Sequence, residues 1–392
     1  MEVSIVHNIP SPYRLHLFDA FARELRRYGW GLQVEFMAQR HADRPAQWFA
    51  GNVSRTSYTE VFHRDWPQRW RNHVYHFNPS LLFALTVNPP DVILLGGLWD
   101  SLTCAMLAAG PFRPKVGWLE ANTKGPPDSL RRGIIKGALL HQWEALVGPG
   151  REGERYVRGV GFRSSRDVPV FKLPNIVDEQ PFNQTSVEKR AAAARWRREF
   201  TAGDQRRIAL VPARLIPAKG LVPFLELLAE VRPADWKIII IGDGPLRSEI
   251  VACIERQGLN AMVGMQKYVA YEEMPAVYAA ADLFVLPSIH DPNPLSVVEA
   301  MHSGLPLVIS DQTGNFGEAL VPGENGWSYD GLAPVNSRAA LAAAFSATPG
   351  VLARMGARSR ELAGERWGTQ HVISRLAMEL VQLSEGSQGK IV

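Results

Sequence analysis

Residues 286–310 read LPSIHDPNPLSVVEAMHSGLPLVIS, and this stretch carries the pattern from which the fold is predicted. Its first residues close an apolar run, ADLFVLPS, that is typical of a buried parallel strand. DPNPLS then predicts a loop, because two prolines and an asparagine do not continue a strand. A short helix is expected from about Ser296 to Gly304, followed by a second buried strand, PLVIS. The stretch therefore indicates a domain of alternating strands and helices around a parallel sheet.

Two acidic residues, Asp291 and Glu299, bracket the predicted loop and stand eight positions apart. The amides at the start of a helix that follows a parallel strand carry partial positive charge, and such helix ends bind phosphate and other anions. Carboxylates beside a helix end of this kind accept hydrogen bonds from the hydroxyls of a polyhydroxylated ligand. The same spacing also occurs on ordinary solvated surface, so the spacing alone leaves both interpretations open.

Composition sets broad limits on the class of protein. A chain of 392 residues is long enough for two domains. Its two cysteines, Cys104 and Cys253, are far apart, which argues against a disulfide framework and is consistent with a reducing cytoplasm. The N-terminus lacks the basic and apolar segments of a signal peptide. The most apolar long run, residues 92–110, is interrupted by glycines and polar residues, which favours strand, loop and helix over a membrane span.

The formal charge of +4 is unevenly distributed. Residues 1–178 contain 22 Lys and Arg against 16 Asp and Glu, whereas the rest of the chain contains 21 against 23. A basic N-terminal half suits an anionic partner such as a lipid surface or a pyrophosphate-linked acceptor, and a solvated basic face explains it equally well. Residues 128–143 predict a basic amphipathic helix, which suits an anionic membrane surface or packing on its own sheet. No nucleic-acid-binding motif occurs.

Both halves of the chain begin with a strand, a loop and a helix. In the first half, EVSIVH is followed by the loop NIPSPYR at residues 8–14, which has no glycine and is therefore no dinucleotide fingerprint. In the second half, a strand at 208–213 is followed by RLIPAKG, in which Arg214 and Lys219 stand five positions apart. Two such cations can converge on one diphosphate, although a solvated helix entrance is the alternative for this pair alone.

Together these segments resemble the retaining GT-B glycosyltransferases, most closely glycosyltransferase family four. The stretch from 286 to 310 is similar to the E-x7-E signature of that family, with Asp291 in place of its first Glu and Asn293-Pro294 in place of Phe-Gly. RLIPAKG resembles the family's R-L-x-x-x-K-G element, and residues 237–245, KIIIIGDGP, end in its G-D-G-P turn. NIPSPYR resembles the opening of many polysaccharide-assembly members. The resemblance covers nearly the whole chain and is strongest for residues 208–326.

The resemblance implies a GT-B fold, with two Rossmann-like α/β domains facing a central cleft. It implies an N-terminal acceptor-binding domain at 1–180, a C-terminal nucleotide-sugar-binding domain at 181–370, and a final helix at 371–392 that returns to the N-terminal domain. It also implies transfer of a sugar from a UDP- or GDP-linked donor with retention of anomeric configuration.

Individual roles follow from the same resemblance. Arg214 and Lys219 are expected to stabilise the charge on the departing diphosphate, and Asp291 to hold hydroxyls of the donor sugar. Glu120 is expected to be the catalytic acid that retaining members often carry near the end of an N-terminal-domain strand, pointing into the cleft. The residues expected to bind the donor are Glu299, Asn293, Leu295, Ser296, Gly242, Lys267 and Tyr268. Among them, Glu299 is expected to hold the ribose hydroxyls. The residues expected to meet the acceptor or a phosphate are Tyr13 and Arg14.

The acceptor expected first is a lipid-linked glycan in bacterial polysaccharide biosynthesis, handled in the cytoplasm or peripherally at the inner face of the plasma membrane. Three alternatives remain open: glycosylation of a soluble natural product, a nucleotide-sugar 2-epimerase, and a non-catalytic nucleotide-sugar-binding protein. Three departures from the family's pattern motivate the last of these: Ala213 and Lys267 stand where the family usually has Gly, and Asp291 stands where it has Glu. No D-x-D motif occurs, so we expect no divalent metal and no cofactor beyond the nucleotide-sugar substrate.

Overall fold

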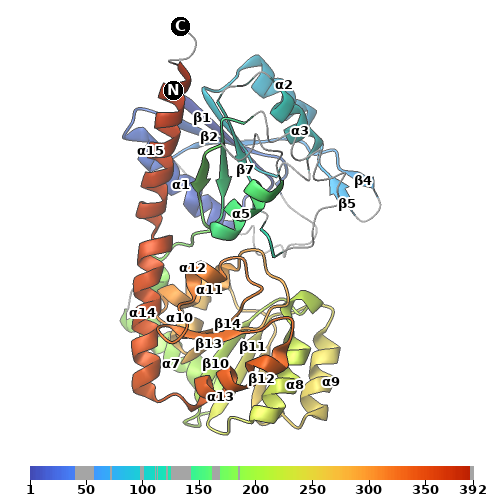
Figure 1. Cartoon of the computed structure of the whole chain (residues 1–392), viewed down its shortest axis with the longest axis vertical. Helices are drawn as coiled ribbons and strands as arrows, with labels where there is room; N and C mark the ends of the chain where they lie inside the picture. The colour runs from blue at the N-terminus through green and yellow to red at the C-terminus, as the bar shows by residue number, and fades with distance from the viewer. Residues whose placement is uncertain are drawn as a thin grey trace. The chain divides into compact units, whose positions relative to one another are not determined.

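A computed structural model of the whole chain is shown in Figure 1. The structure describes residues 1–39, 57–70, 73–97, 101–110, 112, 114–120, 122–124, 143–160, 168–183 and 186–388. The amphipathic helix predicted at 128–143 lies outside these residues, except for Trp143. The chain forms two compact units: unit 1 is Met1–Asn175 together with Thr369–Val392, and unit 2 is Ile176–Gly368. Domain limits had been expected at 180 and 370.

Among the described residues, unit 1 contains a parallel seven-stranded sheet in the order β3-β2-β1-β6-β7-β8-β9. Its strands are β1 (Glu2–His7), β2 (Gly31–Phe36), β3 (Thr59–Phe62), β6 (Val92–Leu95), β7 (Lys115–Trp118), β8 (Ala145–Gly148) and β9 (Val170–Lys172). The central strands are buried apolar runs, as expected for a parallel sheet covered on both faces. A small antiparallel pair consists of β4 (Gln68–Trp70) and β5 (His73–Tyr75).

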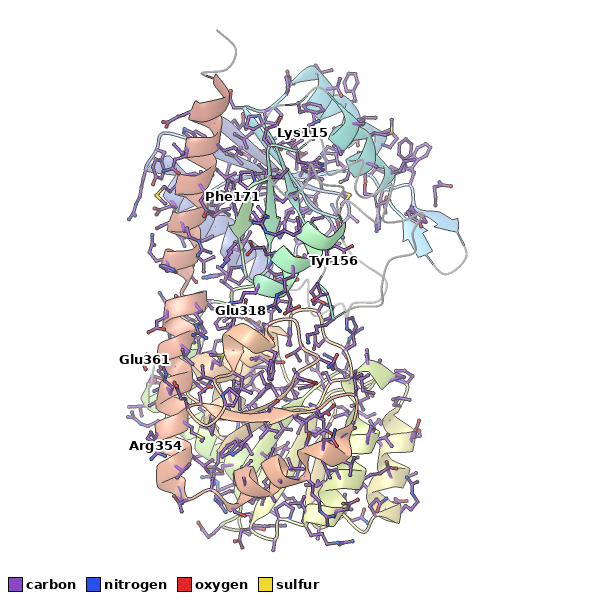
Figure 2. All side chains as sticks on the ribbon, viewed as in Figure 1. Lys115, Tyr156, Phe171, Glu318, Arg354 and Glu361 are labelled. Atoms are coloured by element: carbon purple, nitrogen blue, oxygen red, sulfur yellow. The ribbon has the colours of Figure 1, made fainter. Side chains whose placement is uncertain are left out.

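Among the described residues of unit 1, the helices are α1 (Pro12–Arg26), α2 (Pro79–Val87), α3 (Leu102–Ala109), α5 (Arg151–Val160) and α15 (Thr369–Gln388). Lys115, labelled in Figure 2, is buried at the start of β7, where its ammonium donates to the carbonyls of Ala108 and Gly110, both at 2.8 Å. This cation therefore closes the carboxyl end of α3, where it compensates the partial negative charge of the helix.

The C-terminal helix α15 belongs to unit 1, because it packs along α1. Its buried apolar residues recur at helical spacing: Val372, Ile373, Leu376, Ala377 and Leu380. Polar contacts flank this stripe, since Gln370 and Ser374 donate to the Glu24 carboxylate at 2.9 and 3.0 Å. Among the described helices, none is both long and apolar enough to cross a lipid bilayer.

In the described part of unit 2, six parallel strands form a sheet in the order β12-β11-β10-β13-β14-β15. They are β10 (Arg207–Pro212), β11 (Trp236–Ile241), β12 (Val263–Gln266), β13 (Leu283–Leu286), β14 (Leu307–Ser310) and β15 (Gly326–Tyr329). Side chains at alternating positions of the strands, and so from one face of this sheet, form a hydrophobic core with the helices that cover that face. The predicted α/β architecture with two parallel sheets is thereby confirmed.

Helices alternate with these strands along the chain. The α-helices are α6 (Gln180–Asn183), α7 (Val187–Thr201), α8 (Leu221–Val231), α9 (Arg247–Arg256), α10 (Met274–Ala279), α11 (Leu295–His302), α12 (Phe316–Ala319), α13 (Arg338–Ser346) and α14 (Pro349–Trp367). The short 3₁₀ helices are η3 (Pro217–Lys219), η4 (Tyr271–Glu273) and η5 (Pro334–Ser337).

The strand order of unit 2 reverses between β10 and β13. The chain runs outward from β10 to β12 and then returns to place β13 on the other side of β10. In open parallel sheets such a switch point is where ligands bind, beyond the carboxyl ends of the strands. The loops after β10 and β13 touch there: Gly220 has a φ of +63°, and a Cβ on it would lie 2.3 Å from the Pro287 carbonyl oxygen. Glycine therefore permits this close approach.

Candidate functional site

Lys219 and Asp291 meet at the switch point of unit 2. Lys219 ends η3 after β10, Asp291 lies in the loop after β13, and the ammonium donates to the carboxylate in an ion pair. Both side chains are largely buried, with exposed fractions of 16% and 10%. The Asp291 carbonyl also accepts a hydrogen bond of 2.8 Å from the Gly314 amide, which ties its loop to the chain beyond β14. A cation and an anion are thus held at the strand ends where a ligand would meet them.

Glu299 lies on α11 and is nearly buried, with 9% of its surface exposed. The Tyr278 hydroxyl donates to its Oε2 atom at 2.7 Å. Burial raises the pKa of Glu299 to about 7, and the hydrogen bond from Tyr278 opposes this increase. Burial and then the Glu299 carboxylate raise the pKa of the Tyr271 phenol, whose side chain lies close by. The Glu299 carboxyl group therefore gains or loses its proton near neutral pH.

The loop between β13 and α11 contains buried polar atoms that have no hydrogen-bond partner among the described residues: Ser288 Oγ, His290 Nδ1 and Asn293 Nδ2. The loop is nevertheless held in place, because Asn315 donates from its amide to the Pro294 carbonyl at 3.1 Å. Buried polar groups normally have partners, so a cluster of unpaired ones at a switch point is typical of a site for a polar ligand.

The other expected donor-binding residues lie at the same edge of the sheet. Arg214 follows β10, Gly242 follows β11, and Lys267 and Tyr268 follow β12, while Leu295 and Ser296 form the first turn of α11. Arg214, Lys267 and Tyr268 are exposed. Gly242 is required by close packing, because a Cβ there would lie 1.9 Å from the Ala213 carbonyl oxygen. No side chain caps the amino end of α11, so its first amides remain available to an anion.

In unit 1, the structure brings together Arg14 and Glu120. Arg14 has no exposed surface, forms an ion pair with Glu120, and donates to the Asn175 side chain at 2.8 Å. Its guanidinium carbon also lies 4.4 Å from the centroid of the Trp118 ring. Arg14 was expected to meet an acceptor or a phosphate, but tertiary packing against the indole buries it. The exposed member of the pair is Glu120, whose side chain is 53% exposed.

Replacing Arg14 with lysine is expected to destabilise unit 1 by about 2 kcal/mol, because an ammonium does not stack on the Trp118 ring as a planar guanidinium does. Chemical unfolding measures this change. Arg23→Lys is the matched control on α1, since Arg23 is exposed and pairs with nearby Asp19. Equal stability of the two variants would contradict a structural role for the buried guanidinium.

Sequence analysis did not identify Tyr278, which directly contacts Glu299. Tyr278 lies on the short helix α10 among apolar residues and has no exposed surface. The available signal was chemical: a tyrosine within an apolar, buried segment needs a partner for its hydroxyl. That signal does not say which of the acids in the chain is the partner.

A family model described as "Glycosyl transferases group 1" matches residues 193–360. The α-D-kanosaminyltransferase of Streptomyces kanamyceticus is 31% identical over 147 residues, which are 37% of this chain and 37% of that protein. A GDP-mannose-dependent α-(1-6)-phosphatidylinositol monomannoside mannosyltransferase of Mycolicibacterium smegmatis is 29% identical over 206 residues, or 50% of this chain and 53% of that one. The matched segments thus span about a third to a half of these relatives.

Solved structures match over nearly the whole chain. Anabaena HepE, crystallised with UDP and glucose, superposes with a TM-score of 0.75 at 18% identity, covering 97% of this chain and 100% of that one. The sucrose-phosphate synthase of Thermosynechococcus elongatus gives a TM-score of 0.73 at 16% identity, with coverages of 98% and 100%. At these identities the likeness establishes the fold, which is GT-B.

Proposed function

We propose that this protein transfers a sugar from a nucleotide diphosphate sugar to an acceptor, because residues 193–360 match the group 1 glycosyl transferase model and the chain has the GT-B fold. The observation that carries the proposal is the Lys219–Asp291 ion pair at the switch point of unit 2. Glu299 and the uncapped start of α11 follow in the same strand–loop–helix segment. Cations, amides and carboxylates in this arrangement suit a diphosphate joined to two polyhydroxylated rings.

The donor in this proposal is a UDP- or GDP-linked sugar. HepE was crystallised with UDP, and the mycobacterial relative is named for GDP-mannose. Lys219, Arg214 and the α11 amides would stabilise the negative charge that grows on the departing diphosphate. Glu299 would accept hydrogen bonds from the ribose, and Asp291 from the donor sugar. We further propose that the reaction retains anomeric configuration and proceeds without a divalent metal.

Titration calorimetry in the presence of a chelator tests donor binding. The wild-type protein is expected to bind one of UDP-glucose, UDP-galactose, UDP-N-acetylglucosamine and GDP-mannose, and Glu299→Ala is expected to weaken binding at least about 30-fold by removing an acceptor of ribose hydrogen bonds. Glu255→Ala is the control, because Glu255 is exposed near the carboxyl end of α9, which in a strand–helix unit lies at the opposite edge of the sheet.

The same samples distinguish the alternative functions. Isomerisation of the donor without an acceptor would favour a 2-epimerase, and binding without turnover for every acceptor would favour a non-catalytic protein. Loss of affinity in Glu255→Ala equal to that in Glu299→Ala would contradict the proposed donor site.

We propose a lipid-linked glycan as the acceptor, bound by unit 1 at the surface of an anionic membrane. Neighbouring helices α2 and α3 contain no charged residue and expose Phe83, Val87, Leu102 and Met106. Unit 1 contains 24 Lys and Arg against 17 Asp and Glu, and this positive balance suits anionic lipid. Two relatives, named as an α-D-kanosaminyltransferase and a 2-deoxystreptamine glucosyltransferase, keep a soluble natural product as the second candidate.

Flotation with phosphatidylglycerol vesicles tests the membrane contact. At low salt we expect the wild-type protein to float with the vesicles, and we expect Phe83→Ser with Met106→Ser to reduce the bound fraction severalfold by removing apolar surface. Leu332→Ser with Val335→Ser is the matched control, because these side chains are equally exposed but belong to unit 2. Failure of the wild-type protein to float would leave the soluble acceptor as the better candidate.

A further inference from the structure

The hydrogen bond between Tyr278 and Glu299 joins two buried side chains from different helices. The Tyr278 hydroxyl lies 2.7 Å from Glu299 Oε2, whereas its distance to the Ser296 carbonyl oxygen is 3.4 Å. A phenol has one hydrogen to donate, so the short contact to the carboxylate takes it. The described residues form no hydrogen bond to the second carboxylate oxygen, Oε1. The Tyr278 side chain has no exposed surface, whereas Glu299 keeps 9% of its surface exposed.

The position of this hydroxyl is set by packing. The Tyr278 ring meets Phe182 edge-on with a centroid distance of 5.8 Å, and it lies 6.3 Å from the ring of Phe284 in β13. Aromatic contacts of this kind hold a ring in one orientation. The hydroxyl is therefore a fixed donor aimed at α11, and it restricts the rotation of the Glu299 carboxylate.

We propose that Tyr278 is a positioning residue for the donor: it holds Oε2 of Glu299 and thereby directs Oε1 toward the ribose diol. The inference rests on the proposed function, because it assigns Glu299 to the ribose. A hydroxyl pair recognised by one fixed carboxylate oxygen gives selectivity for ribonucleotides over 2′-deoxyribonucleotides. Tyr278 itself is buried and does not touch the ligand, so it acts through Glu299.

The same hydrogen bond favours the charged form of Glu299. Burial raises the pKa of this carboxyl to about 7, and the bond from Tyr278 lowers it. Titratable and charged side chains surround α11. Near Glu299 lie Tyr278 on α10 and Tyr271 on η4, the latter with Asp178 and Glu272 beside it. Glu318 lies on α12, and Arg360 on α14 lies with Glu179 near His302 at the carboxyl end of α11. Because Tyr278 directly donates to the carboxylate, its loss should shift the acidic limb of ribonucleotide binding to higher pH.

The test is calorimetric titration of UDP, GDP and their 2′-deoxy counterparts between pH 6.0 and 8.5. For whichever ribonucleotide the wild-type protein binds, we expect Tyr278→Phe to weaken affinity about fivefold to tenfold at pH 7. At pH 8.5 part of this loss should be recovered, because the carboxylate is then ionised without help, whereas the part due to lost positioning should remain. Binding of the 2′-deoxynucleotide should be nearly unchanged at every pH.

Two variants serve as controls. Glu299→Gln should weaken ribonucleotide binding without recovery at pH 8.5, because an amide does not ionise. Tyr329→Phe should bind as wild type does, because Tyr329 is also fully buried in unit 2 but its hydroxyl has no hydrogen-bond partner among the described residues. Phenylalanine keeps the ring packing of Tyr278, and melting temperatures of both phenylalanine variants verify the fold.

Three outcomes would overturn the proposal in distinguishable ways. Unchanged ribonucleotide affinity in Tyr278→Phe at pH 7 would show that Glu299 needs no positioning by the phenol. If Tyr278→Phe weakened binding of the ribonucleotide and of its 2′-deoxy counterpart equally at all pH values, Tyr278 would contribute to packing alone. Absence of binding of UDP and GDP by the wild-type protein would overturn the proposed donor site, and this inference with it.

Discussion

Replacing Lys219 with methionine is expected to reduce kcat/KM for sugar transfer on the order of 10²–10³-fold, because a positioned cation at a developing negative charge contributes about this much. Donor affinity should fall much less than turnover, since the charge on the diphosphate is greatest when the glycosidic bond breaks. Initial rates with the preferred donor and acceptor measure the change. A loss confined to KM would contradict the role in transition-state stabilisation.

The same substitution also tests the ion pair as a structural contact. Lys219→Met leaves Asp291 as a largely buried carboxylate without its partner, so we expect unit 2 to lose about 2 kcal/mol of stability. Asp291→Asn should cost a similar amount, whereas the double variant should lose less than the sum of the two single losses. Arg358→Met is the control for an exposed pair, with Glu324, and should change stability by less than about 1 kcal/mol. Additive losses would show that the pair is not coupled.

Glu299→Gln is expected to stabilise the ligand-free protein above pH 7. The pKa of Glu299 is about 7 in the folded protein and 4.5 as a free side chain. Between these values the folded state holds a proton that the unfolded state has lost, so the carboxyl makes stability fall as pH rises from 4.5 to 7. Above pH 7 the penalty is complete and amounts to about 3 kcal/mol, at 1.4 kcal/mol for each pH unit. Glutamine removes this penalty and can still accept a hydrogen bond from Tyr278.

Urea unfolding of the wild-type protein and Glu299→Gln at pH 5 and pH 8 measures the effect. The difference in unfolding free energy should favour the variant by about 3 kcal/mol at pH 8 and by less than about 1 kcal/mol at pH 5. Glu255→Gln, on an exposed site, should follow the wild-type curve at both pH values. Parallel pH dependence of Glu299→Gln and wild type would contradict the raised pKa. Confirmation would mean that the proposed donor site retains a carboxylate that destabilises the empty protein.

The position of the candidate site at one edge of the unit 2 sheet could be predicted from the sequence. The apolar runs before Arg214 and before Asp291 predict parallel strands, and their loops must then emerge at the same edge of one sheet. The helix containing Glu299 was likewise expected from the residues after Pro294. These features are local, or they depend on a general property of parallel sheets, and for that reason the pattern of residues was sufficient to predict them.

Contacts between distant residues did not follow from sequence. Lys219 and Asp291 are 72 residues apart, and their direct pairing depends on how closely two loops approach at Gly220. The partner of Tyr278 depends on how α10 packs against α11. Arg14 was expected to meet a ligand because its loop resembles one that faces the cleft in the family, and its burial against Trp118 did not follow from that resemblance. Tertiary geometry decided each of these cases.

The packing of α15 on α1 has a consequence for folding during translation. Unit 1 is discontinuous, because its segments Met1–Asn175 and Thr369–Val392 are separated by the whole of unit 2. The ribosome must therefore synthesise all of unit 2 before the apolar face of α1 can be covered by α15. At roughly 5–20 residues per second, this exposes the nascent N-terminal unit for about 10 to 40 seconds. We therefore expect the internal unit to complete its fold first, and a chaperone that binds apolar surface to associate with the emerging N-terminal unit.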